Sequence, residues 1–268
     1  METIGYAASL LIGISLGMIG GGGSILTVPV MVYFFGLQPL IATSYSLFVV
    51  GSTSLIGAFS NFRRGLVNVK AAMVFGASSI ITVFVTRKFL VMLIPKDIFK
   101  IGGVTINEAF LTMVLFALLM LVASISMIRN KRITATEEEC SDRVRFGKLT
   151  GYGIVIGLVT GLLGAGGGFL LIPALVVLMK LPMKKAIGTS LMIIAFNSLI
   201  GFTGDLGHFP IDWLFLLKVT AVAVVGIFIG GAITRKISGE NLKKGFGWFV
   251  MVMGVYIIFN EMILKRPS

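Results

Sequence analysis

Charged residues are scarce in this sequence. Only 13% of its 268 residues are Asp, Glu, Lys or Arg, there is a single His, and 56% are hydrophobic, with a mean hydropathy of +1.01. A soluble globular domain carries about 25% charged residues, so that class is excluded. The charges are also unevenly spread, because no ionisable Asp, Glu, Lys, Arg or His occurs over 3–62, 109–128, 149–179 or 186–204. Stretches of this length can cross a lipid bilayer.

The sequence also lacks the motifs of several other classes of protein. The single cysteine, Cys140, excludes an intrachain disulfide. There is no Gly-x-x-x-x-Gly-Lys-Ser/Thr run, so ATP hydrolysis by this chain is not expected. One His without paired acids in the apolar runs argues against a membrane-embedded enzyme. We therefore expect no metal and no cofactor. The apolar start after Met1 predicts a first membrane segment rather than a removable signal peptide.

Basic residues outnumber acidic ones, 23 to 11. They stand in short clusters between apolar runs, a pattern that orients membrane helices rather than one that binds phosphodiester backbones. The expected partners are therefore membrane lipid, a small anion and, as an open possibility, further copies of the chain in a homo-oligomer. Nucleic acid is not expected.

The chain contains an internal duplication. Shifting the sequence by 144 positions aligns Ile12–Gly57 with Ile156–Gly201, and 17 of these 46 positions are identical without a gap. The matches include six glycines and the pair Pro29 and Pro173, which apolar composition alone does not produce. We divide the chain into a first membrane repeat at 1–128, a charged linker at 129–148 and a second membrane repeat at 149–268.

The apolar runs predict helices, because backbone groups inside a bilayer must bond within their own segment and the alternation of a membrane-barrel strand is absent. The expected fold is an all-α integral membrane protein with an inverted internal repeat, in which each half has a glycine-tipped helical hairpin and three transmembrane helices. The expected helical runs are Ile4–Ile19, Ser24–Gly36, Ile41–Phe59, Ala71–Ile94, Ala109–Ile128, Leu149–Leu163, Gly168–Met179, Ala186–Thr203, Trp213–Ile233 and Phe246–Leu264.

Basic residues indicate that the chain turns back at each run of glycines. If it does, 16 basic residues fall on one side of the membrane and 6 on the other, leaving out Lys218 inside a helical run, whereas straight crossings give no bias. Since Lys and Arg collect in the cytoplasm, the linker with Cys140 is expected there and both termini outside. The pair Arg87 and Lys88 contradicts this bias.

The second arms of the two hairpins are short. Ser24–Gly36 and Gly168–Met179 reach about 18–20 Å at 1.5 Å per residue, less than a hydrocarbon core of about 30 Å. We therefore favour re-entrant hairpins over two full spans, with tips near the midplane. Each half has an odd number of crossings, so the halves are expected to be inverted and their glycine tips to meet.

The glycine runs are the candidate substrate site, because helix N-termini beside exposed backbone bind anions without a basic side chain. Helix packing is the competing interpretation, favoured at the four-residue spacings of Gly13, Gly17, Gly157 and Gly161. The predicted substrate-binding residues are Gly20, Gly21, Gly22, Gly23, Ser24, Ser46, Gly164, Gly166, Gly167, Gly168, Ser190 and Asn197.

Polar side chains in the following spans could complete the site. Ser46, Ser190 and Asn197 could donate to an oxyanion, although Ser hydroxyls also bond back to their own helix. Asp205 and His208 are candidates for coupling transport to protons. A solvated loop beside Pro210 is the alternative for these two residues.

Both repeats carry a related motif. It reads Gly20-Gly-Gly-Gly-Ser-Ile-Leu-Thr-Val-Pro29 and Gly164-Ala-Gly-Gly-Gly-Phe-Leu-Leu-Ile-Pro173, each followed by Ala-x-x-x-Ser-Leu, at Ala42 and Ala186. Over nearly its whole length the chain resembles the sulfite exporter TauE/SafE family of permeases. The resemblance implies a secondary transporter in the bacterial cytoplasmic membrane for a small anion, a sulfur oxyanion or organosulfonate. An anion channel remains an alternative, and a membrane-embedded enzyme a weaker one.

Overall fold

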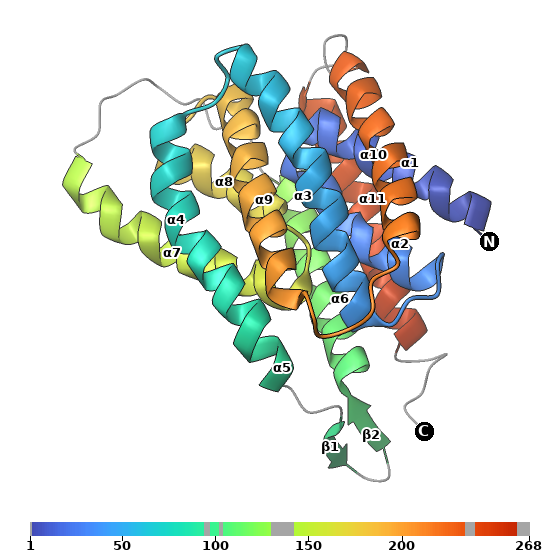
Figure 1. Ribbon diagram of the computed structural model, residues 1–268. Coiled ribbons are helices and arrows are strands. Elements are labelled where there is room, and N and C mark those ends of the chain that lie inside the picture. The colour runs from blue at the N-terminus through green and yellow to red at the C-terminus, as the bar shows by residue number, and fades with distance from the viewer. Residues whose placement is uncertain (1, 94–96, 102–103, 130–141, 234–238, 262–268) are drawn as a thin grey trace.

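The structure is a computed structural model that describes residues 2–93, 97–101, 104–129, 142–233 and 239–261. Helices make up nearly all of it (Figure 1). The first half contains α1 (Glu2–Ile19), the 3-10 helix η1 (Gly21–Leu26), α2 (Thr27–Tyr33), α3 (Pro39–Arg63), α4 (Val69–Val85), the π-helical turn η2 (Thr86–Leu90), α5 (Val91–Leu93) and α6 (Glu108–Arg129). The second half contains α7 (Asp142–Leu163), α8 (Gly168–Leu178), α9 (Met183–Asp205), α10 (Trp213–Ile233) and α11 (Gly239–Phe259).

Within the described residues, helices occupy the expected runs, with four differences. In the run Ser24–Gly36 the α-helix covers only Thr27–Tyr33, after a 3-10 start. The run Ala71–Ile94 is not one regular helix, because η2 widens its last part into a π turn. Helix α7 begins at Asp142, inside the segment assigned to the linker, and Cys140 lies outside the described residues. Between α5 and α6, β1 (Asp97–Ile101) and β2 (Val104–Asn107) pair as an antiparallel ribbon, which the apolar pattern did not predict.

The helices pack in pairs that exchange partners between the two halves. At the centre, α3 lies beside α9 and runs in the opposite direction, since α3 ends and α9 begins at the top of Figure 1. On one side α4 packs against α7, and on the other α10 packs against α1; α6 pairs with α11. The first helix of each half therefore rests on a helix of the other half, so neither half completes its packing alone.

Matched hydrogen bonds join the halves at both ends of the central helices. The N–H of Asn68 donates to the Thr189 hydroxyl at 2.9 Å, and the N–H of Asp212, at the equivalent position, donates to the Tyr45 hydroxyl at 2.6 Å. Asn68 and Asp212 also cap α4 and α10, since their side chains accept from the N–H groups of Ala71 and Phe215. The duplicated sequence thus forms the same pair of hydrogen bonds twice, once at the start of α4 and once at the start of α10.

Glycines let the exchanged helices approach closely. A Cβ atom on Gly13 or Gly17 of α1 would overlap the backbone of α10. In α7, a Cβ on Gly157 would lie 2.6 Å from the Ser79 carbonyl oxygen, and one on Gly161 would lie 2.7 Å from the Thr86 Cβ. The packing interpretation of these four glycines is confirmed.

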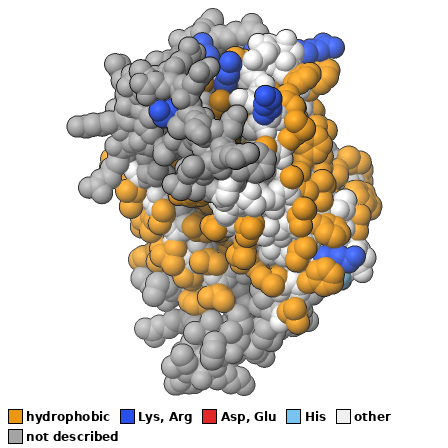
Figure 2. All heavy atoms as spheres, turned by 90° about the vertical axis from the view of Figure 1, so that its left-hand side faces the viewer, with side chains coloured by type: hydrophobic (Ala, Val, Ile, Leu, Met, Phe, Trp, Pro, Cys, Tyr) orange, Lys and Arg blue, Asp and Glu red, His pale blue; other side chains and the backbone are white. Residues whose placement is uncertain are grey.

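The outer face of the bundle is apolar. Large side chains are exposed on α4 and α7, including Met73, Ile81 and Val155, and hydrophobic side chains cover much of this side of the molecule (Figure 2). Of the described residues, four helical segments are long and apolar enough to span a membrane: Pro39–Arg63, Val69–Leu90, Met183–Asp205 and Trp213–Ile233. Helices of this length with exposed apolar side chains are suited to contact with the hydrocarbon core of a bilayer, so the chain is a membrane protein.

The close α7–α4 contact makes a stability prediction. Gly157→Ala should lower the free energy of unfolding by about 1–3 kcal/mol, because the new methyl group must displace the Ser79 backbone. Gly151→Ala, on the same helix with nothing within 4 Å of its Cβ position, should be neutral or slightly stabilising. Thermal unfolding of the two purified variants measures the difference. Equal stability would contradict the packing role of Gly157.

Candidate functional site

The two glycine runs break the helices in different ways. Gly20 ends α1 with φ 77° and ψ −118°, and the chain continues as the 3-10 helix η1 before α2 begins at Thr27. In the second half Gly164, Gly166 and Gly167 all have positive φ, and α8 begins directly at Gly168. These backbone angles need glycine. The expectation that both arms start as α-helices is therefore wrong for the first arm, which has no α-helical N-terminus at Ser24.

The breaks from the two halves meet at the centre of the bundle. Gly21 and Gly168 are in direct backbone contact, so that a Cβ atom on either would overlap the Cα atom of the other. Gly166 lies against Val50 and Ile194, which occupy the middle of α3 and α9. The glycine breaks of the two repeats thus lie in contact, as predicted, beside the middle of α3 and α9.

Close packing surrounds the break glycines as well. A Cβ atom on Gly20 would lie 2.9 Å from Ile187, and one on Gly164 would overlap the backbone of Thr43, the residue equivalent to Ile187. A Cβ atom on Gly23 would collide with the Ser15 hydroxyl. The surroundings of Gly22 lie outside what is described. An alanine at these positions would change packing together with any ligand approach, so glycine variants do not separate the two roles.

Backbone donors remain free at the second break. The N–H of Gly164 bonds to the Thr160 carbonyl at 2.9 Å, and the N–H groups of Leu170 and Leu171 bond to the Gly167 carbonyl. Within the described residues, the N–H groups of 165–167, which precede α8, donate to no backbone carbonyl. Free N–H groups at the start of an α-helix attract anions.

Buried hydroxyls without partners lie around the same break. A Cβ atom on Gly166 would be 3.1 Å from the Ser198 Oγ, and one on Gly167 would overlap the Thr160 Oγ1. Among the described residues, the buried hydroxyl and amide oxygens that lack a hydrogen-bond partner include those of Thr27, Ser46, Ser54, Thr160, Ser198 and Asn197, of which Thr160 and Ser198 border this break. Buried polar atoms are normally bonded, so this group of side chains can still serve a ligand or water.

Other predicted site residues are already bonded. Ser24 donates to the Gly21 carbonyl at 2.7 Å, and Ser190 donates to the Ile187 carbonyl at 2.9 Å, as expected for hydroxyls that bond back to their own helix. Asn197 donates through Nδ2 to the Ser79 hydroxyl at 2.6 Å and joins α9 to α4. Ser46, one of the predicted site residues, is unpartnered. Ser198, which the polar pattern beside Asn197 also offered, and Thr160, which the sequence reasoning missed, border the second break.

Asp205 and His208 lie in different surroundings. Asp205 is the last residue of α9 and is only 1% exposed, whereas His208 is exposed in the turn that follows. The interpretation as a solvated loop therefore fits His208 and is wrong for Asp205.

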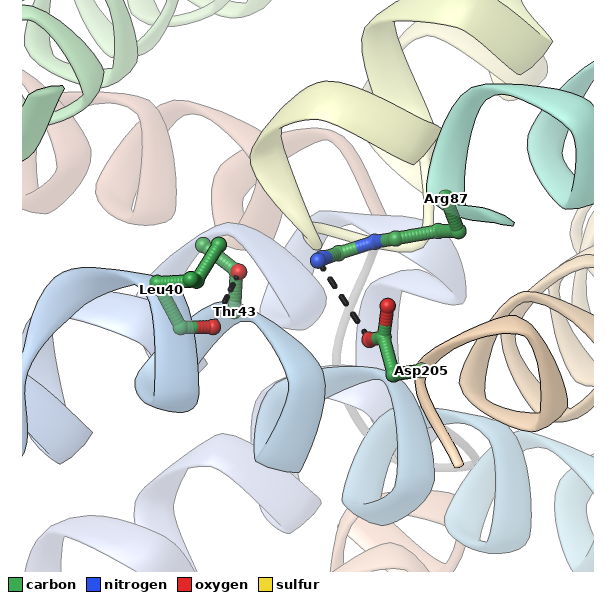
Figure 3. Close-up of polar contacts among 4 residues, drawn as sticks. All are labelled: Leu40, Thr43, Arg87 and Asp205. Carbon is green, nitrogen blue, oxygen red and sulfur yellow. Dashed lines mark hydrogen bonds and ion pairs between the residues drawn. The ribbon is translucent and has the colours of Figure 1, made fainter. Parts of the chain in front are cut away.

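A buried arginine faces Asp205. Arg87, in η2, has no exposed surface, and its Nη1 lies 3.4 Å from the Asp205 Oδ2. Figure 3 shows the guanidinium extending toward Asp205 and toward the first turn of α3, where Thr43 donates to the Leu40 carbonyl. Sequence reasoning missed this pair, although one signal was present: Arg87 contradicted the charge bias. Since its side chain is inside the protein, Arg87 does not act as a loop charge that orients the helices.

The Arg87–Asp205 ion pair is longer than a typical hydrogen-bonded salt bridge. Hydrogen bonds between a guanidinium and a carboxylate are normally about 2.7–2.9 Å long, and none of the guanidinium nitrogens has a hydrogen-bond partner among the described residues. Removal of one member of a buried pair leaves an uncompensated charge and costs about 3–5 kcal/mol. The two charges therefore stabilise each other, but the surrounding residues leave the guanidinium without hydrogen-bond acceptors.

No group of three or more His, Cys, Asp or Glu side chains within the described part of the chain could hold a metal ion. The arrangement of unpartnered amides, hydroxyls and one buried cation is suited to contact with an anion rather than to coordination of a metal.

Fold and site together define a helical membrane transporter built from a duplicated unit with two broken helices. The chain belongs to the sulfite exporter TauE/SafE family, whose pattern it matches over residues 6–257. It is 27% identical over 263 residues to a probable membrane transporter protein of Xylella fastidiosa strain 9a5c, covering 97% of this chain and 95% of the relative.

Two further relatives agree with this assignment. The chain is 24% identical to the probable membrane transporter protein YdhB of Bacillus subtilis, over 93% of this chain and 97% of the relative. It is also 24% identical to sulfite exporter TauE/SafE family protein 3 of Arabidopsis thaliana, over 50% of this chain and 29% of the relative. No solved structure matches the chain.

Proposed function

We propose that the protein is a secondary transporter that moves a small anion across the cytoplasmic membrane by alternating access, with the substrate bound where the two glycine breaks meet. The contact between Gly21 and Gly168 at the middle of the central helices is the observation that carries this proposal. Interrupted helices that meet near the bilayer midplane are the general substrate site of transporters built from repeats.

An inverted repeat is part of the proposal. The equivalent helices α3 and α9 run in opposite directions (Figure 1), and the equivalent hydrogen bonds from Asn68 and Asp212 support two halves related by a twofold axis in the membrane plane. In this arrangement the α1–α2 hairpin enters from outside and the α7–α8 hairpin from the cytoplasm. Rocking of one half against the other would expose the breaks alternately to the two sides.

The proposed substrate is a sulfur oxyanion or an organosulfonate. The free N–H groups before α8 and the unpartnered hydroxyls of Thr160 and Ser198 provide several donors to one group of oxygens. The predicted site residues Gly20–Ser24, Ser46, Gly164, Gly166–Gly168, Ser190 and Asn197 remain part of this proposal. The family description supports sulfite and related anions as the substrate class.

Coupling to protons through Asp205, with His208 beside it, belongs to the same proposal. Proteoliposomes containing the protein should accumulate sulfite against its gradient with a rate that saturates. Asp205→Asn should abolish accumulation and leave exchange of internal for external sulfite, since the variant cannot release a proton. Asp212→Asn, exposed at the start of α10, is the matched control and should accumulate normally.

The same uptake measurement separates the proposal from its alternatives. A flux that does not saturate and never exceeds equilibrium would identify an anion channel, and chemical conversion of the anion would identify an enzyme. Accumulation by Asp205→Asn equal to that of the unmodified protein would remove Asp205 from coupling.

Hydroxyl variants test the binding site without adding volume. Ser198→Ala and Thr160→Val should each weaken sulfite binding about 2- to 10-fold, because each removes one hydrogen bond worth about 0.5–1.5 kcal/mol. Ser9→Ala is the control, since this buried hydroxyl bonds to the Gly5 carbonyl. Titration calorimetry on the purified proteins gives the dissociation constants. Unaltered affinity in both site variants would place the substrate elsewhere.

The membrane orientation predicts how cysteines react from outside. In intact cells, Cys140 should resist a membrane-impermeant maleimide and react after permeabilisation, because the basic linker is expected in the cytoplasm. Pro210→Cys, exposed after α9, should react in intact cells when Cys140 is replaced by Ser. Reaction of both cysteines from the same side would refute the proposed topology.

A further inference from the structure

The surroundings of Arg87 leave its hydrogen-bonding capacity unused. A guanidinium has five N–H donors in a fixed planar fork, and none of them has a hydrogen-bond acceptor among the described residues. The nearest charge is the Asp205 carboxylate at 3.4 Å. Arg87 also lies in the π-helical turn η2, and π turns within α-helices recur at functional sites. A purely structural arginine at this depth would be expected to have its donors paired.

We propose that Arg87 binds the transported oxyanion directly and that the Asp205 carboxylate occupies the place of the anion when no substrate is present. The inference rests on the proposed function, because it takes the substrate to be an oxyanion. It adds a charged residue that lies outside the glycine breaks. The oxyanion displaces the carboxylate and presents two of its oxygens to the guanidinium fork, as carboxylates and phosphates do in proteins.

The position of Asp205 makes it the member of the pair that yields. It is the last residue of α9, where the helix dipole disfavours a negative charge, and the next residues, Leu206 and Gly207, are exposed. A small unwinding of the end of α9 would bring the carboxylate to water. Arg87 lies instead within the continuous helical segment from α4 to α5 and packs against Gly204, whose Cβ position lies 3.1 Å from the Arg87 Cβ.

Arg87 is also linked to the second glycine break through its neighbours. Thr86 packs against Gly161 near the end of α7, and Thr43, in the turn of α3 that the guanidinium approaches, packs against Gly164. The Ser44 hydroxyl lies beside the Asp205 carboxylate. An anion that contacts Arg87 would therefore meet the same helix end and the same turn of α3 that border the break.

A structural salt bridge makes a different prediction. Replacement of both members of a buried ion pair by neutral groups of similar size is often neutral or stabilising, whereas removal of one member is destabilising. The double variant Arg87→Gln/Asp205→Asn should therefore fold whether or not the pair binds substrate. What distinguishes the two roles is the response of each variant to the anion.

The experiment is a thermal-unfolding and calorimetric titration of the purified full chain with sulfite, thiosulfate, sulfate and methanesulfonate, each at ionic strength matched with chloride. Four proteins are compared with the unmodified one: Arg87→Gln/Asp205→Asn, Asp205→Asn, Arg87→Gln and Lys88→Gln. Lys88 is the matched control, because it is the neighbouring cation and its side chain is exposed.

If Arg87 binds the anion, the double variant folds and binds the best anion at least about 10-fold more weakly, as expected for the loss of a hydrogen bond to a charged group. Asp205→Asn unfolds at a lower temperature without anion and gains a larger increase in unfolding temperature from the anion than the unmodified protein does, because the anion replaces the missing carboxylate. Lys88→Gln behaves like the unmodified protein.

Three outcomes would overturn the inference. Unchanged affinity in the double variant, with binding retained by the unmodified protein, would leave the proposed function intact and assign Arg87 a structural role. A stabilisation of Asp205→Asn by anion that does not exceed that of the unmodified protein would refute the displacement step, even if the double variant failed to fold. Absence of any response in the unmodified protein would refute both proposals.

Discussion

Backbone polar groups inside a bilayer must find partners within the protein, because lipid offers none. This constraint governs the whole fold, since the chain breaks two helices in the middle of its apolar bundle. The breaks are possible because each half covers the other: α1 rests on α10, α7 rests on α4, and Gly21 touches Gly168 where the two interruptions meet. An isolated half would leave its break facing lipid. The exchange of helices between halves and the site at their contact therefore have the same physical origin.

The two repeats share their helix arrangement but differ in the backbone and side chains at equivalent positions. Asn68 and Asp212 form equivalent corners, yet the arm after Gly20 starts as a 3-10 helix and the arm after Gly167 starts as an α-helix. Asp205 has Asn61 at its equivalent position in the first repeat, and Asn61 bonds to its own helix through the Gly57 carbonyl. The shared sequence pattern thus supplies the equivalent contacts at the two ends of the central helices. The differences within it leave the free N–H groups at the second break only, and the buried ion pair joins η2 of the first repeat to α9 of the second.

Glycine serves two purposes in this protein, and position decides which of them applies. In the helical arms, Gly13 and Gly157 allow two helix backbones to touch, a role that needs one small residue per turn. At Gly164, Gly166 and Gly167 the backbone adopts positive φ, which other residues rarely adopt, and leaves N–H groups unbonded. Even there the glycines are closely surrounded by protein atoms. The same glycines can therefore allow both close packing and approach of a ligand. A substitution of a side chain such as Ser198 tests the proposed binding site without adding volume, unlike a substitution of a glycine.

The sequence by itself determined the membrane class, the duplication and nearly all helices, because the spacing of charges and the long apolar runs are local properties of the chain. It also indicated the glycine breaks and their meeting, since the repeat requires equivalent parts to lie in equivalent places. Only the tertiary structure decided the 3-10 start of the first arm, the bonded state of Ser24 and Ser190, and the burial of Asp205 against Arg87. Arg87 and Asp205 belong to different repeats, and their contact depends on how η2 packs beside the end of α9. A pairing of that kind has no local sequence pattern, because it is set by the three-dimensional packing of segments far apart in the chain.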